Sequence, residues 1–158
     1  MKGKIICPVD FSEGSDSALA YAAGLARKLG VELELVHVYQ VPSLAMPDGA
    51  VLATPTFLAN LTSRAQEELD RSRARVADDG LQVTTALLQG NPADTLVEHA
   101  ARQGASMIVM GTHGRTGLAR MLLGSVAERV VRTARVPVLT VRSPAAETAS
   151  RSADTVAD

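Results

Sequence analysis

The hydrophobic and polar positions of this 158-residue chain alternate between short apolar runs and segments with helical spacing. Short runs rich in valine, isoleucine and leucine, bounded by turn residues, are typical of strands. The run at 105–110 is almost continuously apolar, as expected of a parallel strand that is covered on both faces. The predicted strands are residues 4–10, 31–39, 81–88, 105–110 and 136–142.

Four helices are predicted between these strands, because apolar residues recur there at intervals of three and four. Capping residues precede them and glycines follow most of them, which are the usual signals of helix starts and stops. The predicted helices run from the capping segment 11–16 to Gly30, from 56 to 79, from Asn91-Pro92 to Gly104, and from 125 to 134.

This order of elements predicts the α/β fold class, as a single-domain, open, five-stranded parallel sheet with helices on both faces. The domain is expected to cover residues 1–142. Residues 40–55 carry three prolines and no clear period, so we expect a loop there, either a lid or a variable insertion. The tail 143–158 has almost no large apolar residues and is expected to be disordered.

Composition narrows the class of protein. Hydrophobic residues make up 46% of the chain, with no tryptophan, two tyrosines and two phenylalanines, so the core must be aliphatic. A formal net charge of −1 gives no general attraction to nucleic acid or to an anionic membrane. There is no apolar segment of signal-peptide or membrane-spanning length, so we expect a soluble cytoplasmic protein. The single cysteine, Cys7, follows two isoleucines and is expected to be buried and unreactive.

The segment 111–125 is the strongest functional signal, because it joins a buried strand to a helix through glycine-rich backbone. Gly111, Gly114 and Gly124 allow close approach of the backbone, and Ser125 adds a hydroxyl at the positive end of a helix. These features together favour an anion, most simply phosphate. The alternative, that the glycines only turn the chain, is equally consistent with this pattern taken alone.

The carboxyl ends of parallel strands meet at one edge of a sheet, which directs Asp10, Val38 and Gly111 toward the same crevice. The Asp10 carboxylate could accept hydrogen bonds from ribose hydroxyls or help to hold a metal beside phosphates. Its alternative role is that of a helix-capping or solvent-facing acid. Val38 would give a nucleotide base an apolar wall, although ordinary core packing is the more common role of such a valine.

Basic side chains near the glycine segment are ambiguous. His113, Arg115, Arg120 and Arg129 could reach phosphates, or could simply be solvated. His37 alternates with core neighbours on a strand and is expected to be a hydrogen-bonded structural residue. No role is assigned to His99, and one cysteine with three scattered histidines predicts no metal-ligand cluster.

The pattern Gly-x2-Gly-x9-Gly-Ser from Gly111 to Ser125 resembles the universal stress protein family, as do the sequences ICPVDFS at 6–12 and LVHV at 35–38. The resemblance spans residues 4–142 and implies the family's five-stranded α/β fold. The glycine pattern is that of the family's ATP-binding branch, so ATP, with Mg²⁺ as a possible companion, is the implied cofactor.

Carried over by position, the resemblance implies two groups of nucleotide contacts. The group expected beside adenine and ribose is Pro8, Val9, Asp10, Val38, Met110 and Gly111, with Asp10 on the ribose. Asp10 is also the one candidate for a metal ligand, and a weak one. The group expected around the phosphates is Gly114, Gly124, Ser125 and Val126, with His113 and Arg115 as further candidates. Ala127 stands where some ATP-binding members have a hydroxyl residue, so one phosphate hydrogen bond is expected to be missing.

The resemblance implies a regulatory module in the stress response, in which ATP changes what a homodimer can bind. In the family the last strand pairs antiparallel with its counterpart, so the strand Val136–Val141 is the expected dimer contact. The downstream protein partner is not identified by the sequence. One alternative is a slow ATPase or a phosphoryl or adenylyl transferase, for which no catalytic base is evident. The other is a dimerisation module that binds no nucleotide.

Overall fold

A computed structural model describes residues 3–41, 54–114 and 123–143, and in these ranges strands and helices alternate as predicted. Their bounds differ from the sequence predictions by only a few residues. The strands are β1 (Lys4–Pro8), β2 (Glu32–Tyr39), β3 (Val83–Gln89), β4 (Met107–Gly111) and β5 (Val138–Val141). The helices are α1 (Glu13–Leu29), α2 (Pro55–Val76), α3 (Pro92–Arg102) and α4 (Ser125–Thr133).

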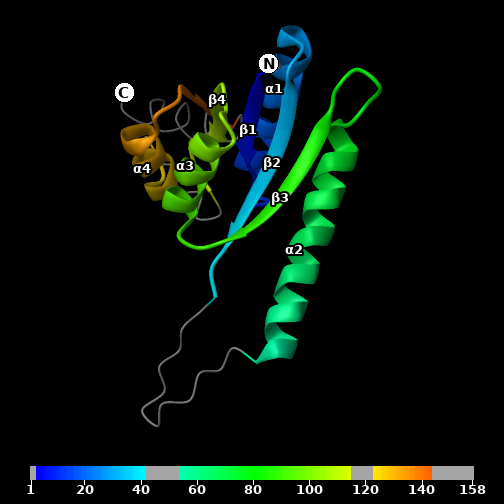
Figure 1. Cartoon of the computed structure of the whole chain (residues 1–158), viewed down its shortest axis with the longest axis vertical. Helices are drawn as coiled ribbons and strands as arrows, with labels where there is room; N and C mark the ends of the chain where they lie inside the picture. Colours follow the sequence, from blue (N-terminus) through cyan, green and yellow to red (C-terminus); the bar gives the residue numbers. More distant parts are fainter. Residues whose placement is uncertain (1–2, 42–53, 115–122, 144–158) are drawn as a thin grey trace, which may run out of the picture.

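The five strands form one parallel sheet in the order β3-β2-β1-β4-β5 (Figure 1). The chain adds strands toward one edge up to β3 and then returns to the other side of β1 with β4. The two strands on either side of this reversal, β1 and β4, pair in the register Ile5↔Met107. In open α/β sheets, ligands bind outside the carboxyl ends of the strands at such a reversal. The predicted fold class is confirmed.

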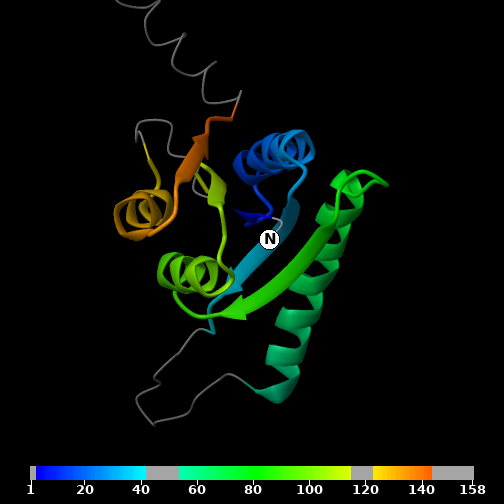
Figure 2. The same cartoon turned by 45° about the horizontal axis from the view of Figure 1, so that its top comes forward.

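Helices cover both faces of the sheet, as Figure 2 shows: α1 and α2 lie on one face, α3 and α4 on the other. Side chains of a strand alternate between the two faces. On β1, Ile5 and Cys7 belong to the core under α1 and α2, whereas Ile6 belongs to the core under α3 and α4. The alternation of side chains between the two faces continues to Val9, which lies in the same core as Ile5 and Cys7. This alternation determines which side chains at the end of β1 can face the crevice.

A charged group is buried at the amino end of the sheet, under α3. The Lys4 ammonium lies 3.5 Å from a carboxylate oxygen of Glu32 and 3.6 Å from one of Glu34. The Nε2 atom of His99 lies 3.1 Å from the same Glu34 oxygen. His99, which has no assigned role in the sequence analysis, is thus a buried partner of a carboxylate. This cluster is structural and lies at the end of the sheet opposite to the crevice.

The Cys7 thiol lies in the centre of the sheet with no exposed surface. Burial disfavours the charged thiolate and raises the pKa of Cys7 from its ordinary 9.0 to about 12. The expected burial of this residue is therefore confirmed.

Because only the thiolate attacks disulfide reagents, we expect Cys7 to react with an aromatic disulfide at pH 8 only when the protein unfolds. At that pH a thiol of pKa about 12 is ionised in roughly one molecule in ten thousand. The stopped-flow absorbance of the released thiol should follow the unfolding rate in urea. As the pH rises above 9, the unfolded thiol ionises before the folded one, so the stabilisation by the neutral thiol is lost toward pH 12. Rapid reaction in native buffer would contradict this description of Cys7.

Candidate functional site

The turn after β1 and the segment after β4 lie against each other, backbone to backbone. A Cβ atom added to Gly14, in the first turn of α1, would lie 2.6 Å from the His113 carbonyl oxygen. One added to Gly111 would lie 2.8 Å from the Gly14 carbonyl oxygen. Neither position has room for a side chain, so these two glycines allow the two segments to meet.

Gly14 is absent from the residues singled out in the sequence. The only sequence signal for it is that glycine is a weak helix former, which makes its place in the first turn of a helix unusual. The sequence alone does not say which segment Gly14 would meet.

Asp10 lies at the point where the two segments meet. Its Oδ1 atom accepts hydrogen bonds from the Ser12 N–H at 3.1 Å and from the Ser12 hydroxyl at 2.5 Å. Its Oδ2 atom faces Gly114, where an added Cβ would lie only 2.7 Å away. The cap of α1 is Ser12, whose hydroxyl accepts from the Ser15 N–H, so Asp10 does not fill the alternative capping role.

The amino end of α4 is joined to the same place. The Gly124 N–H donates to the Thr112 carbonyl at 2.7 Å, and the Thr112 N–H donates to the Val141 carbonyl at 3.0 Å. Gly124 is the cap of α4 and supplies no side-chain hydrogen bond to the first turn. Ser125 and Val126, the first residues of α4, are exposed. The helix therefore begins beside Gly114 and presents N–H groups and a hydroxyl at the crevice.

The apolar residues predicted to contact a base lie on the face of the sheet under α3 and α4. Val38 and Met110 belong to the core cluster of that face, Val38 half-buried and Met110 only 5% exposed. Pro8 ends β1 opposite Val36. The Val9 side chain points the other way, into the core under α1 and α2, so Val9 can offer the crevice only its backbone.

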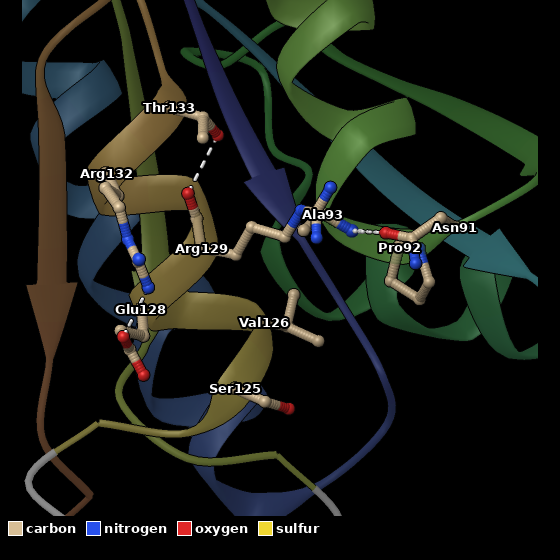
Figure 3. A pocket seen from close by; sticks show the side chains of 9 residues that line it. All are labelled: Asn91, Pro92, Ala93, Ser125, Val126, Glu128, Arg129, Arg132 and Thr133. Carbon is tan, nitrogen blue, oxygen red and sulfur yellow. Dashed lines mark hydrogen bonds and ion pairs between the residues drawn. The ribbon is translucent and has the colours of Figure 1, made fainter.

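A groove of about 450 Å³ lies between the amino-terminal end of α3 and the length of α4 (Figure 3). Ser125 and Val126 line it from α4, and Asn91 and Pro92 line it from α3. In the sequence, Asn91 and Pro92 mark only the start of a helix and are not predicted to belong to the site. Their place beside α4 depends on the packing of the two helices.

The arginines along this groove are already paired. The Arg129 guanidinium holds both carboxylate oxygens of Asp94, at 2.7 and 3.0 Å, which links α4 to α3. Arg132 forms an ion pair with Glu128 one turn earlier, as Figure 3 shows. The ambiguity over Arg129 is thereby resolved in favour of a link between helices.

Two histidines near the site lie within hydrogen-bond distance of backbone or hydroxyl oxygens. The Nδ1 atom of His113 lies 3.0 Å from the Thr112 hydroxyl oxygen, beside the crevice. The Nδ1 atom of His37 lies 2.7 Å from the Val9 carbonyl oxygen, as expected of a hydrogen-bonded structural histidine.

Several sequence predictions fall on residues outside the described part of the chain. They concern Arg115, Arg120, most of the 40–55 loop and nearly all of the 143–158 tail. In the parts that the structure does describe, no group of three or more His, Cys, Asp or Glu residues could hold a metal ion. No described helix is both long enough and apolar enough to cross a membrane.

Comparison with known proteins agrees with this architecture. The sequence profile of the universal stress protein family matches residues 1–142. The chain belongs to the universal stress protein family. It is 38% identical over 145 residues to the universal stress protein MJ0531 of Methanocaldococcus jannaschii, covering 91% of this chain and 84% of that protein.

Solved structures of other family members share the fold. The structure of MJ0577 from Methanocaldococcus jannaschii, obtained for a structure-based assignment of biochemical function, superimposes with a TM-score of 0.78 at 30% identity. The match covers 90% of this chain and 96% of that one. A universal stress protein in complex with cAMP superimposes with a TM-score of 0.62 at 26% identity, covering 90% of this chain and 98% of that one.

The contact between the two segments makes Gly14 a sensitive position. We expect Gly14→Ala to destabilise the protein by about 1–3 kcal/mol, because the new methyl group would meet the His113 carbonyl. Gly24→Ala is the matched control in the same helix, since nothing lies within 4 Å of a Cβ there. That control should stabilise the protein by about 1 kcal/mol. Urea unfolding measures both, and equal stability of the two variants would contradict the close contact.

Proposed function

We propose that this protein binds an adenine nucleotide, ATP in the first place, in the crevice between the ends of β1 and β4, and acts as a nucleotide-dependent regulatory module. The observation that carries the proposal is the packing of the Asp10 carboxylate against Gly114. It brings the acid expected to bind ribose next to the backbone expected to bind phosphates. The family member in complex with cAMP supports a nucleotide of the adenine class.

In this proposal each part of the crevice takes one part of the nucleotide. Adenine lies against the apolar side chains at the ends of the strands, and Asp10 accepts hydrogen bonds from the ribose hydroxyls. The phosphates lie at the amino end of α4, where the helix dipole and the N–H groups of the first turn favour negative charge. The residues assigned to adenine and ribose are Pro8, Val9, Asp10, Val38, Met110 and Gly111. Those assigned to the phosphates are Gly114, Gly124, Ser125 and Val126, with His113 and Arg115 beside them.

The side chains at the crevice fit Mg²⁺ only if the phosphates of a bound nucleotide supply further oxygen ligands. Mg²⁺ in nucleotide sites is commonly held by one or two carboxylates together with phosphate oxygens and water. Asp10 is the carboxylate that the described residues bring to this crevice, and its Oδ1 is already bonded to Ser12. We therefore assign Mg²⁺, when it accompanies ATP, mainly to the phosphates.

Among the described residues, the pairing of the charged side chains favours binding over catalysis. Phosphoryl transfer needs cations at the reacting phosphates and a group that orients the nucleophile. The groove arginines Arg129 and Arg132 are each paired with a carboxylate, and Ser12 holds Asp10 as a hydrogen-bond acceptor. The alternative of a slow ATPase or transferase would be favoured by turnover well above background that Asp10→Asn abolishes.

Substitution at the contact between Asp10 and Gly114 tests the nucleotide site. We expect Gly114→Val to weaken ATP binding at least tenfold, because its side chain would occupy the space in front of the Asp10 carboxylate. Asp10→Asn should weaken binding about ten- to a hundredfold, because the loss of a charged acceptor costs on the order of 1.5–3 kcal/mol. Isothermal titration calorimetry measures both, with Gly24→Ala as the control that should bind as the wild type does. Unchanged affinity in both variants would contradict the proposed site. If the wild type does not bind ATP at millimolar concentration, the alternative of a dimerisation module that binds no nucleotide is favoured.

We also propose a homodimer through the strand Val136–Val141, which contains β5. β5 is an outer strand of the sheet and pairs only with β4 among the described residues. The Pro137 and Val141 carbonyls accept hydrogen bonds from the β4 side. Because backbone groups alternate in direction along a strand, the N–H groups of Val138 and Thr140 point away from β4. Such an apolar open edge invites pairing with a second chain.

The outward N–H of Thr140 gives a direct test of this dimer. Thr140→Pro removes that donor and leaves the bonds to β4, because proline is tolerated on the open side of an edge strand. We expect this variant to be monomeric by size exclusion with light scattering, at a concentration where the wild type is dimeric. Thr140→Val, which keeps the N–H, should remain dimeric. A dimeric Thr140→Pro protein would exclude pairing through this edge.

A further inference from the structure

We infer that His37 is a positioning residue for Asp10: it fixes the two residues on either side of Asp10 and thereby sets selectivity for the ribose hydroxyls. The inference rests on the proposed nucleotide function and adds a residue that does not touch the nucleotide. It follows from the hydrogen bond of His37 to Val9 and its ring contact with Phe11.

His37 cannot line the crevice itself. On β2 its neighbours Val36 and Val38 belong to the core under α3 and α4, the face that carries the proposed adenine wall. Side chains of adjacent strand residues point to opposite faces, so the His37 ring lies on the face of α1 and α2. Any effect of His37 on a nucleotide must therefore pass through the turn after β1.

The first contact holds the residue before Asp10. The Nδ1 atom of His37 lies 2.7 Å from the Val9 carbonyl oxygen. A carbonyl can only accept a hydrogen bond, so Nδ1 must carry the proton. The Val9 N–H donates to the Val36 carbonyl at 2.9 Å, so β2 binds Val9 through both its N–H and its C=O. The peptide that leads into Asp10 is thus fixed in direction.

The second contact holds the residue after Asp10. Phe11 has a φ of 64°, and it is the only described residue other than glycine with a positive φ. For a bulky side chain this conformation is strained and persists only where the surroundings impose it. The Phe11 and His37 ring centroids lie 4.5 Å apart with a tilt of 30°, within the range of favourable ring contacts. The His37 ring is therefore part of what keeps Phe11 in the left-handed region.

These two contacts together fix the turn from which the Asp10 side chain projects. The left-handed turn at Phe11 places the Ser12 N–H and hydroxyl within reach of Oδ1, while Oδ2 faces Gly114. If the contacts of His37 are lost, Phe11 can relax to an ordinary negative φ, and the Asp10–Ser12 bonds are lost with the turn. The backbone around Gly124 is held by its bond to Thr112, and the segment before Gly114 by its contact with Gly14 in α1, and neither contact involves His37. Loss of His37 should accordingly impair recognition of the sugar and spare recognition of the phosphates.

The test compares ATP with 2′,3′-dideoxy-ATP, which keeps the base and phosphates and lacks the hydroxyls assigned to Asp10. We expect the wild type to prefer ATP by about tenfold or more. His37→Leu should bind ATP about tenfold more weakly and dideoxy-ATP as the wild type does, so that the preference disappears. His37→Asn keeps a donor near the Nδ1 position and should retain part of the preference. In an Asp10→Asn background, His37→Leu should cause no further loss, since both changes remove the same interaction.

Other results would overturn the inference. Equal weakening of both nucleotides by His37→Leu, or full additivity with Asp10→Asn, would mean that His37 only stabilises the fold. Failure of the wild type to bind either nucleotide would contradict the proposed function. Amide hydrogen exchange would then still test whether His37 positions Asp10. The Ser12 amide should exchange about tenfold faster in His37→Leu, because its bond to Asp10 is lost, while the Ala93 amide bonded to Asn91 should be unchanged. An unchanged Ser12 amide would exclude the positioning of Asp10 by His37.

Discussion

The backbone contact between Gly14 and the segment 111–114 is the constraint on which the crevice depends. Parallel pairing of β1 with β4 brings the ends of these strands side by side, but only the absence of side chains at Gly14 and Gly111 lets the following segments touch. That contact brings Asp10 against Gly114 and, through the bond from Gly124 to Thr112, brings the start of α4 to the same place. A single bulky residue at this contact would separate the acid from the glycine backbone.

The two faces of the sheet contribute differently to the candidate site. The face under α3 and α4 supplies the surface, with Val38 and Met110 at the strand ends and the groove between the helices. The face under α1 and α2 supplies the support, through the His37 ring and the buried Val9 side chain. Because β1 alternates between these faces, a change on the supporting side reaches the crevice through only two or three peptide units. Packing on the face of α1 and α2 therefore affects the geometry of the candidate site through the turn after β1.

Much of this architecture follows from sequence because it depends on local patterns. Apolar periodicity predicts the strands and helices, and their order predicts the parallel sheet that directs Asp10 and Gly111 to one edge. What sequence did not predict depends on tertiary proximity. No local sequence pattern predicts the left-handed backbone of Phe11, the hydrogen bond between His37 and Val9, or the ion pair between Arg129 and Asp94. Each of these features depends on a contact between different elements of the fold. His99 was likewise unassigned, because its partner Glu34 lies on a strand 65 positions away.

The distribution of charge bears on what such a crevice can do. Phosphates bound by backbone N–H groups are recognised by a rigid framework whose donors need no proton transfer and no side-chain movement. In the part of the chain that the structure describes, the two arginines along the groove are held by carboxylates, Arg129 by Asp94 across the helices and Arg132 by Glu128 within one. Releasing either arginine toward a phosphate would leave its carboxylate partner beside that phosphate, so the gain in attraction would be offset by repulsion. Under the proposed function, such a framework suits the holding of a nucleotide, and the turn that carries Asp10 is where its sugar would be recognised.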